Sequence, residues 1–179
     1  MDQKKSVLAA SLNGGITTGL ILIIYALILY LLNVTTSKPL GYLSLLISGV
    51  LIFIFSKIYR DKELKGYISY GEALGFGVLV GLISSVLLGI FVFIEYKFLD
   101  PGLIDKLMDI AREKMLGKGI DQEQLEKALS ISKWFMTPVV LAISTILFNT
   151  FVSFILSLIT SAIVKKEKNP FDTAMKDIQ

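Results

Sequence analysis

The chain has 179 residues, of which 54% are hydrophobic and 18% are charged, and its formal net charge is +3. An ordinary soluble domain carries roughly 25% charged residues, so the composition excludes that class and indicates a membrane protein. The absence of cysteine and histidine excludes disulfides, thiol nucleophiles, imidazole bases and the common zinc sites.

Four long segments without Asp, Glu, Lys or Arg follow one another along the chain, at 8–32, 39–56, 73–94 and 134–164. Each reaches the length of about 18 apolar residues that crosses a hydrocarbon core. We therefore predict an all-α membrane protein with a single domain, in which four transmembrane helices form an antiparallel bundle. The expected spans are about 11–32, 39–59, 72–95 and 134–164. The first is longer than the apolar core of a signal peptide, so we expect it to remain as an anchor.

Basic residues between and after the spans predict the orientation, because Lys and Arg near span ends favour the cytoplasmic side. Ten of them lie in the N-terminal segment, the 57–71 loop and the 165–179 tail, at Lys4, Lys5, Lys57, Arg60, Lys62, Lys65, Lys165, Lys166, Lys168 and Lys176. The 96–133 loop instead carries a mixture of both signs. We expect both termini to be cytoplasmic and the 96–133 loop to lie outside.

The third span begins at Glu72, where a carboxylate caps the positive end of the helix dipole. Small residues then recur at every fourth position, at Gly77, Gly81, Ser85 and Gly89. In lipid such stripes let helix backbones approach closely. The first span has a shorter series, Ser11, Gly15 and Gly19. No ionisable residue is expected deep in any span, since Glu95 lies at the far end of the third.

The loop after the third span predicts two amphipathic helices. Asp100 and Pro101 have the pattern of an N-cap followed by proline at the first helical position. Glycines at 117 and 119 end this helix, and Asp121, with Gln124 three residues later, predicts a capping box for the second. Three placements of the resulting hairpin are open: it folds back on the bundle, it presents a face to a partner, or it lies on the membrane surface. We favour the first.

The fourth span carries polar residues with the same four-residue spacing, at Thr145, Asn149, Ser153 and Ser157. We predict that this stripe packs against the stripe of the third span and that Asn149 bonds a neighbouring helix. The alternative is that the stripe lines a polar path.

Two segments resemble a known family. These are "ISYGEALGFG" (68–77), with Gly71 and Glu72, and "YKFLDPGLIDKLMD" (96–109), with Asp100 and Pro101. Both are similar to the bacterial integral-membrane family catalogued as domain of unknown function 4199. The resemblance implies four spans with a long loop between the third and fourth, and it implies no established activity.

These features favour a structural or interaction component of the bacterial cytoplasmic membrane. The alternative is a small transporter or channel subunit with a polar path along the fourth span. We expect no enzyme activity, because serine and threonine occur without a base to activate them, and no catalytic, cofactor-binding or metal-binding residues. The expected partners are the lipid bilayer and either a second copy or another membrane protein, contacted through the third span, the fourth span or the 96–133 loop. Nucleic acid is not expected.

Overall fold

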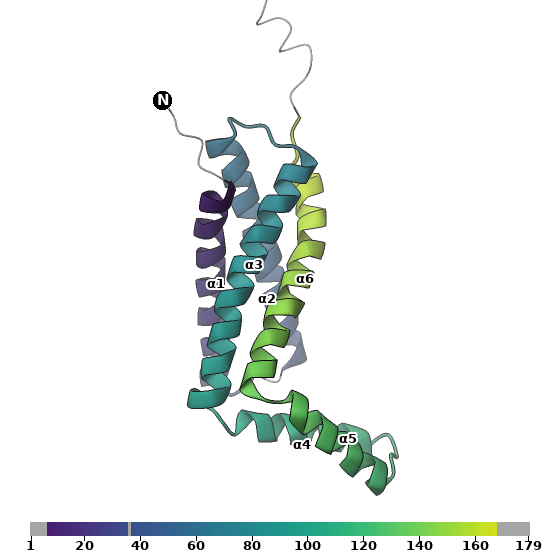
Figure 1. The fold of residues 1–179 in the computed structure, drawn as a ribbon. Coiled ribbons are helices and arrows are strands. Elements are labelled where there is room, and N and C mark those ends of the chain that lie inside the picture. Colours follow the sequence, from purple (N-terminus) through teal and green to yellow (C-terminus); the bar gives the residue numbers. More distant parts are fainter. Residues whose placement is uncertain (1–6, 36, 168–179) are drawn as a thin grey trace, which may run out of the picture.

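The computed structural model describes residues 7–35 and 37–167, and every regular element in these ranges is a helix. Four long helices stand side by side and two shorter ones project from one end of them (Figure 1). The elements are α1 (Val7–Leu31), α2 (Lys38–Ile58), η1 (Tyr59–Glu63), α3 (Tyr70–Ile94), η2 (Glu95–Leu99), α4 (Leu103–Leu116), α5 (Gln122–Phe135) and α6 (Pro138–Val164). The segments η1 and η2 are single π-helical turns that extend α2 and α3.

Four segments are long and apolar enough to cross a membrane: Val7–Leu31, Pro39–Glu63, Tyr70–Leu99 and Pro138–Val164. The first three agree with the predicted spans to within a few residues. The fourth begins later than predicted, because the apolar run at 134–164 contains a helix break. Trp134 belongs to the end of α5, and α6 starts with Pro138 at its first position and Thr137 as its N-cap.

Helix α3 occupies the centre of the bundle. It packs most extensively against α6 and next most extensively against α1, while α2 packs mainly against α6. A cluster of buried apolar side chains joins α2, α3 and α6 and includes Ile52, Phe76 and Val164. The rings of Tyr59 and Phe76 stack with their centroids 4.4 Å apart.

One end of the bundle is held together by backbone contacts. Ile68 and Lys166 form an isolated antiparallel bridge with two hydrogen bonds of 2.9 Å. The Arg60 guanidinium donates to the carbonyl oxygen of Val164 at 2.9 Å. The loop between the second and third spans and the end of α6 therefore lie together. The basic residues Lys4 and Lys5, and those of the tail beyond 167, lie outside the described residues.

The helices α4 and α5 leave the opposite end of the bundle and extend sideways from it (Figure 1). They pack mainly against each other, around a small core of Met108, Leu125 and Leu129, and neither makes an extensive contact with the four long helices. The prediction that this hairpin folds back over the bundle is therefore not what the structure shows. The hairpin is an appendage with its own core.

One predicted helix cap is wrong, and a second lies at the predicted position but lacks the expected hydrogen bonds. Helix α4 begins at Leu103 with Gly102 at its N-cap, so Asp100 and Pro101 lie in the preceding turn. The reason is that η2 continues the third span to Leu99 and leaves 100–102 to make the turn. Asp100 instead pairs with Lys106 at 3.2 Å.

The second predicted cap, on α5, differs in its chemistry. Asp121 does occupy the N-cap position, but its side chain makes no capping hydrogen bond, so the expected capping box with Gln124 does not form.

The predicted cap of α3 does form, because Glu72 lies in a complete capping box with Ser69. The Ser69 amide donates to the Glu72 carboxylate at 3.1 Å, and the Glu72 amide donates to the Ser69 hydroxyl at 3.3 Å.

Candidate functional site

The seam between α3 and α6 brings together most of the small residues of the two predicted stripes. A β-carbon built at Gly77 would lie 2.5 Å from the Ser157 hydroxyl, and one built at Gly81 would overlap the side chain of Ser153. Real β-carbons essentially never approach other atoms within 3.0 Å, so these positions accept only glycine at this helix separation. The glycines of α3 thus form a groove that the serines of α6 fill.

Further along the seam the contacts continue with different partners. At Gly89 a β-carbon would overlap the Ile146 side chain, so an apolar residue fills the groove there. The hydroxyls of Ser85 and Thr150 lie 2.8 Å apart, and Ser85 also donates to the carbonyl of Leu82 at 2.8 Å. When Ser85 uses its proton for that carbonyl, Thr150 is the donor of the interhelical hydrogen bond.

Asn149 does not bridge the two helices as predicted. It is half-buried, and its amide donates to the carbonyl of Thr145 on its own helix at 2.9 Å. A four-residue step advances about 40° beyond a full helical turn, so a strict four-residue series rotates away from a facing helix. From Ser157 back to Thr145 this rotation amounts to about 120°, and Thr150 takes the place expected for Asn149.

Helix α1 forms a second seam on another side of α3. A β-carbon at Gly15 would lie 2.5 Å from the side chain of Ile83. Ser11 and Gly19, the other members of the short series, are also buried. Helix α3 is therefore enclosed closely by α1 and α6, and the small residues of the stripes are used within one chain.

Several buried hydroxyls in the described part of the bundle have no hydrogen-bond partner: those of Thr18, Ser56, Ser157 and Ser161. An unpaired hydroxyl costs free energy in an apolar interior. Because serines are small, the same side chains still allow the close packing described above. They are the polar groups that a path through the bundle would use.

Glu95 is the buried ionisable residue that sequence reasoning missed. It is only 5% exposed, and its Oε1 atom has no hydrogen-bond partner in the described ranges. The sequence places it at the end of an apolar run, which suggests an exposed position. A finer signal was present: Glu95 follows Gly77 by eighteen residues, about five full helical turns, and so lies on the same face of the extended helix. Ionisable residues buried in a span are functional candidates by default.

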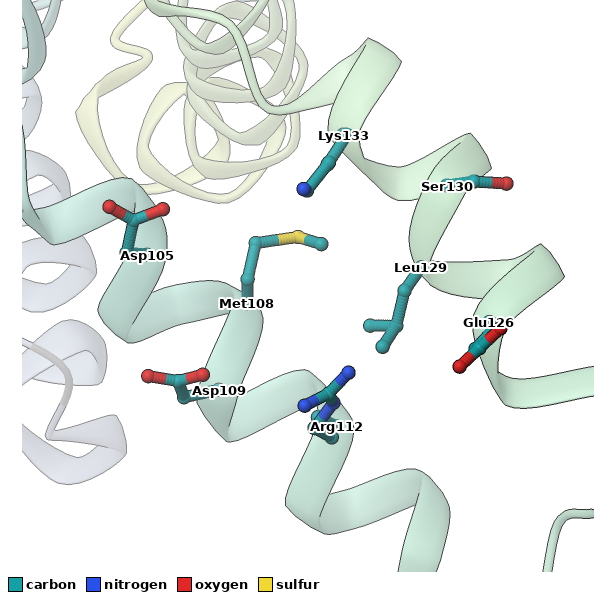
Figure 2. A pocket seen from close by; sticks show the side chains of 8 residues that line it. All are labelled: Asp105, Met108, Asp109, Arg112, Glu126, Leu129, Ser130 and Lys133. Atoms are coloured by element: carbon teal, nitrogen blue, oxygen red, sulfur yellow. The ribbon is translucent and has the colours of Figure 1, made fainter. Parts of the chain in front are cut away.

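The hairpin contains a hollow between its two helices. A cavity of about 380 Å³ lies between α4 and α5 and is lined by Asp105, Met108, Asp109, Arg112, Glu126, Leu129, Ser130 and Lys133. Figure 2 shows Met108 and Leu129 reaching into the space between the helices, while Asp109 and Ser130 lie at its margins. We call this feature the hairpin groove. It has an apolar floor and a rim that carries both charge signs.

In the described ranges, no three or more acidic side chains come together in a group that could hold a metal ion. A family model described as "Protein of unknown function (DUF4199)" matches residues 13–166. No curated protein and no solved structure gives a significant match.

Proposed function

The chain belongs to the DUF4199 family of proteins of unknown function, and from this premise we propose that it is a non-catalytic interaction component of the bacterial cytoplasmic membrane. In this proposal the four spans form an antiparallel bundle with both termini in the cytoplasm. The bundle is an anchor, and the α4–α5 hairpin on the outer side is the part that meets a partner.

The observation that carries the proposal is the contrast between the bundle and the hairpin. The glycines of α1 and α3, and the serines of α6 that lie against α3, are occupied by contacts within the chain, which leaves this part of the stripes unavailable to a second protein. The hairpin, in contrast, makes no extensive contact with the bundle. It carries the hairpin groove, whose rim contains Arg112 and Lys133 together with carboxylates. A rim with both signs favours a partner surface of mixed charge, since complementary charges steer association and fix its register.

A small transporter is the second candidate, favoured by the unpaired hydroxyls and by the buried carboxylate of Glu95. The close contacts at Gly77 and Gly81 oppose it, because the side chains of Ser157 and Ser153 fill the space beside these glycines and leave no room there for a solute. Reconstituted liposomes distinguish the two functions. A reproducible solute flux that Glu95→Gln abolishes without unfolding the protein would support the transporter.

A site-specific photo-crosslinker tests the interaction proposal in intact cells. A photo-crosslinking amino acid in place of Glu126, which lines the hairpin groove, should give a covalent adduct of defined mass with the partner protein. The same replacement at Glu123, one turn earlier and outside the groove, is the matched control and should give none. The adduct should weaken when Arg112→Glu reverses a charge on the rim. Equal labelling at Glu123 and Glu126, or no adduct at either, would contradict a partner at the groove.

A further inference from the structure

We propose that the α4–α5 hairpin lies flat on the bilayer surface, with the side opposite the hairpin groove immersed among the lipid headgroups. This goes beyond the proposed function, because it concerns a different face of the hairpin and a lipid occupant. It also holds whichever side of the membrane the hairpin occupies.

Helix α5 exposes large apolar side chains that its core does not use. Ile131 is 61% exposed, Trp134 82% and Phe135 65%. The residues of α5 that pack against α4 are Leu125 and Leu129, on another side of the helix. An exposed cluster of this size and type typically marks a protein or membrane contact.

Helix geometry separates Ile131 and Phe135 from the groove and places Trp134 between the two sides. At about 100° per residue, the groove residues Glu126, Ser130 and Lys133 share one direction of α5. Ile131 and Phe135 point roughly 150° away from that direction, whereas Trp134 points about 75° away from it, at the lateral edge of the hairpin.

Helix α4 repeats the arrangement. Its groove residues Asp105, Asp109 and Arg112 share one direction, and the half-buried Leu107 and Ile110 lie roughly 160° away. The hairpin therefore has a charged side at the groove and an opposite side on which apolar residues are interspersed with the exposed Lys114 and Gln124. This division is typical of helices that lie in the membrane interface.

Continuity with the spanning helix identifies lipid as the occupant of the apolar side. Trp134 precedes the start of α6 at Pro138 by four residues, which span at most about 14 Å of chain. Val139 and Ile143, in the first turns of α6, are 53% and 52% exposed and face where lipid tails would lie. The apolar surface thus runs from the lipid-facing side of α6 onto α5. Tryptophan is itself enriched at the headgroup level.

The direction of the hairpin agrees with this placement. Figure 1 shows α4 and α5 running obliquely from the end of the bundle, both sideways and away from it, instead of continuing along the four long helices. The sideways component brings the hairpin toward the plane of the membrane. Its length then follows the surface, and the hairpin groove stays open to water.

The single tryptophan of the chain makes the proposal testable without any substitution. The full-length protein is reconstituted in phosphatidylcholine vesicles, and its fluorescence is quenched either by brominated lipid or by aqueous iodide. We expect Trp134 to be quenched strongly by brominated lipid and weakly by iodide. Strong quenching by iodide alone would overturn the proposal.

Matched probes remove the concern that Trp134 lies near the bilayer only because α6 does. In a Trp134→Phe background, Ile110→Trp and its neighbour Asp109→Trp place the probe about 100° apart around α4, the first toward the apolar side and the second toward the groove. We expect several-fold stronger quenching by brominated lipid for Ile110→Trp, and preferential quenching by iodide for Asp109→Trp. Equal quenching of the two variants by iodide would mean that both sides of the hairpin are exposed to water. Protection of Ile110→Trp from both quenchers would mean a protein contact. Either result would overturn the proposal.

Discussion

The closest contact of the α3–α6 seam lends itself to a quantitative test through the single substitution Gly81→Ala. The β-carbon it adds would overlap the Ser153 side chain, whereas the next nearest atom, the Cα of Ser153, lies 3.6 Å away at an ordinary contact distance. Gly75, on the same helix, is the matched control, because a β-carbon there meets nothing within 4 Å. The two substitutions add the same methyl group to the same helix.

The expected magnitude follows from two opposing effects. Alanine is a better helix former than glycine by about 1 kcal/mol, and this gain is common to both positions. Overpacking an interior contact costs about 1–3 kcal/mol, and this cost arises only at Gly81. The free energy of unfolding should therefore be about 1–3 kcal/mol lower for Gly81→Ala than for Gly75→Ala, with Gly75→Ala equal to or above the wild type.

Unfolding in mixed detergent micelles measures these free energies. Adding Ser153→Gly to Gly81→Ala removes the atoms that overlap and leaves only the 3.6 Å contact. The double-mutant cycle should therefore show a favourable coupling within the range of about 0.5–3 kcal/mol found for residues in contact. Equal stabilities of the two alanine variants, or a coupling of zero, would refute the packing described for this seam.

Three other predictions concern single side chains. Asn149→Ala should change the unfolding free energy by less than about 0.5 kcal/mol, because its amide bonds its own helix; a larger loss in the same assay would place it in an interhelical contact. Ser69→Ala removes a formed capping box and should cost about 1 kcal/mol, whereas Asp121→Ala should cost less because its side chain makes no capping bond; thermal melting compares the two. Lys62→Cys and Gln124→Cys test the orientation with an impermeant thiol reagent on intact cells, where only Gln124→Cys should be labelled. Labelling of Lys62→Cys would contradict the proposed orientation.

The spans could be predicted from the sequence because a run without charges needs only length to cross a bilayer. Their ends could not always be predicted. The apolar run extends the predicted fourth span back to Trp134, because nothing in hydropathy distinguishes an apolar end of α5 from the start of α6. The glycine groove was predictable for a similar reason: Gly77 and Gly81 have few uses in lipid other than close packing.

The candidate site was harder to predict because it depends on helix rotation and on tertiary placement. A four-residue series looks like a straight stripe in the sequence, but it winds around a helix of 3.6 residues per turn, and so Thr150 replaced Asn149 at the interface. Glu95 appeared to end its span because charge ends an apolar run, yet the π-helical turn η2 extends the helix past it. The projection of the hairpin depends on its own core, including Met108 and Leu129, and no local pattern reports that two helices prefer each other to the bundle.

The order of synthesis gives the central position of α3 a further consequence. About 70 residues separate Ile94 from the end of α6 at Val164, which corresponds to roughly 4–14 seconds of translation at 5–20 residues per second. During this interval the groove at Gly77 and Gly81 has no helix to fill it, and lipid or the insertion machinery must cover it. The backbone bridge between Ile68 and Lys166 can form only after α6 has been synthesised. This end of the bundle is therefore joined only after the fourth span has been inserted.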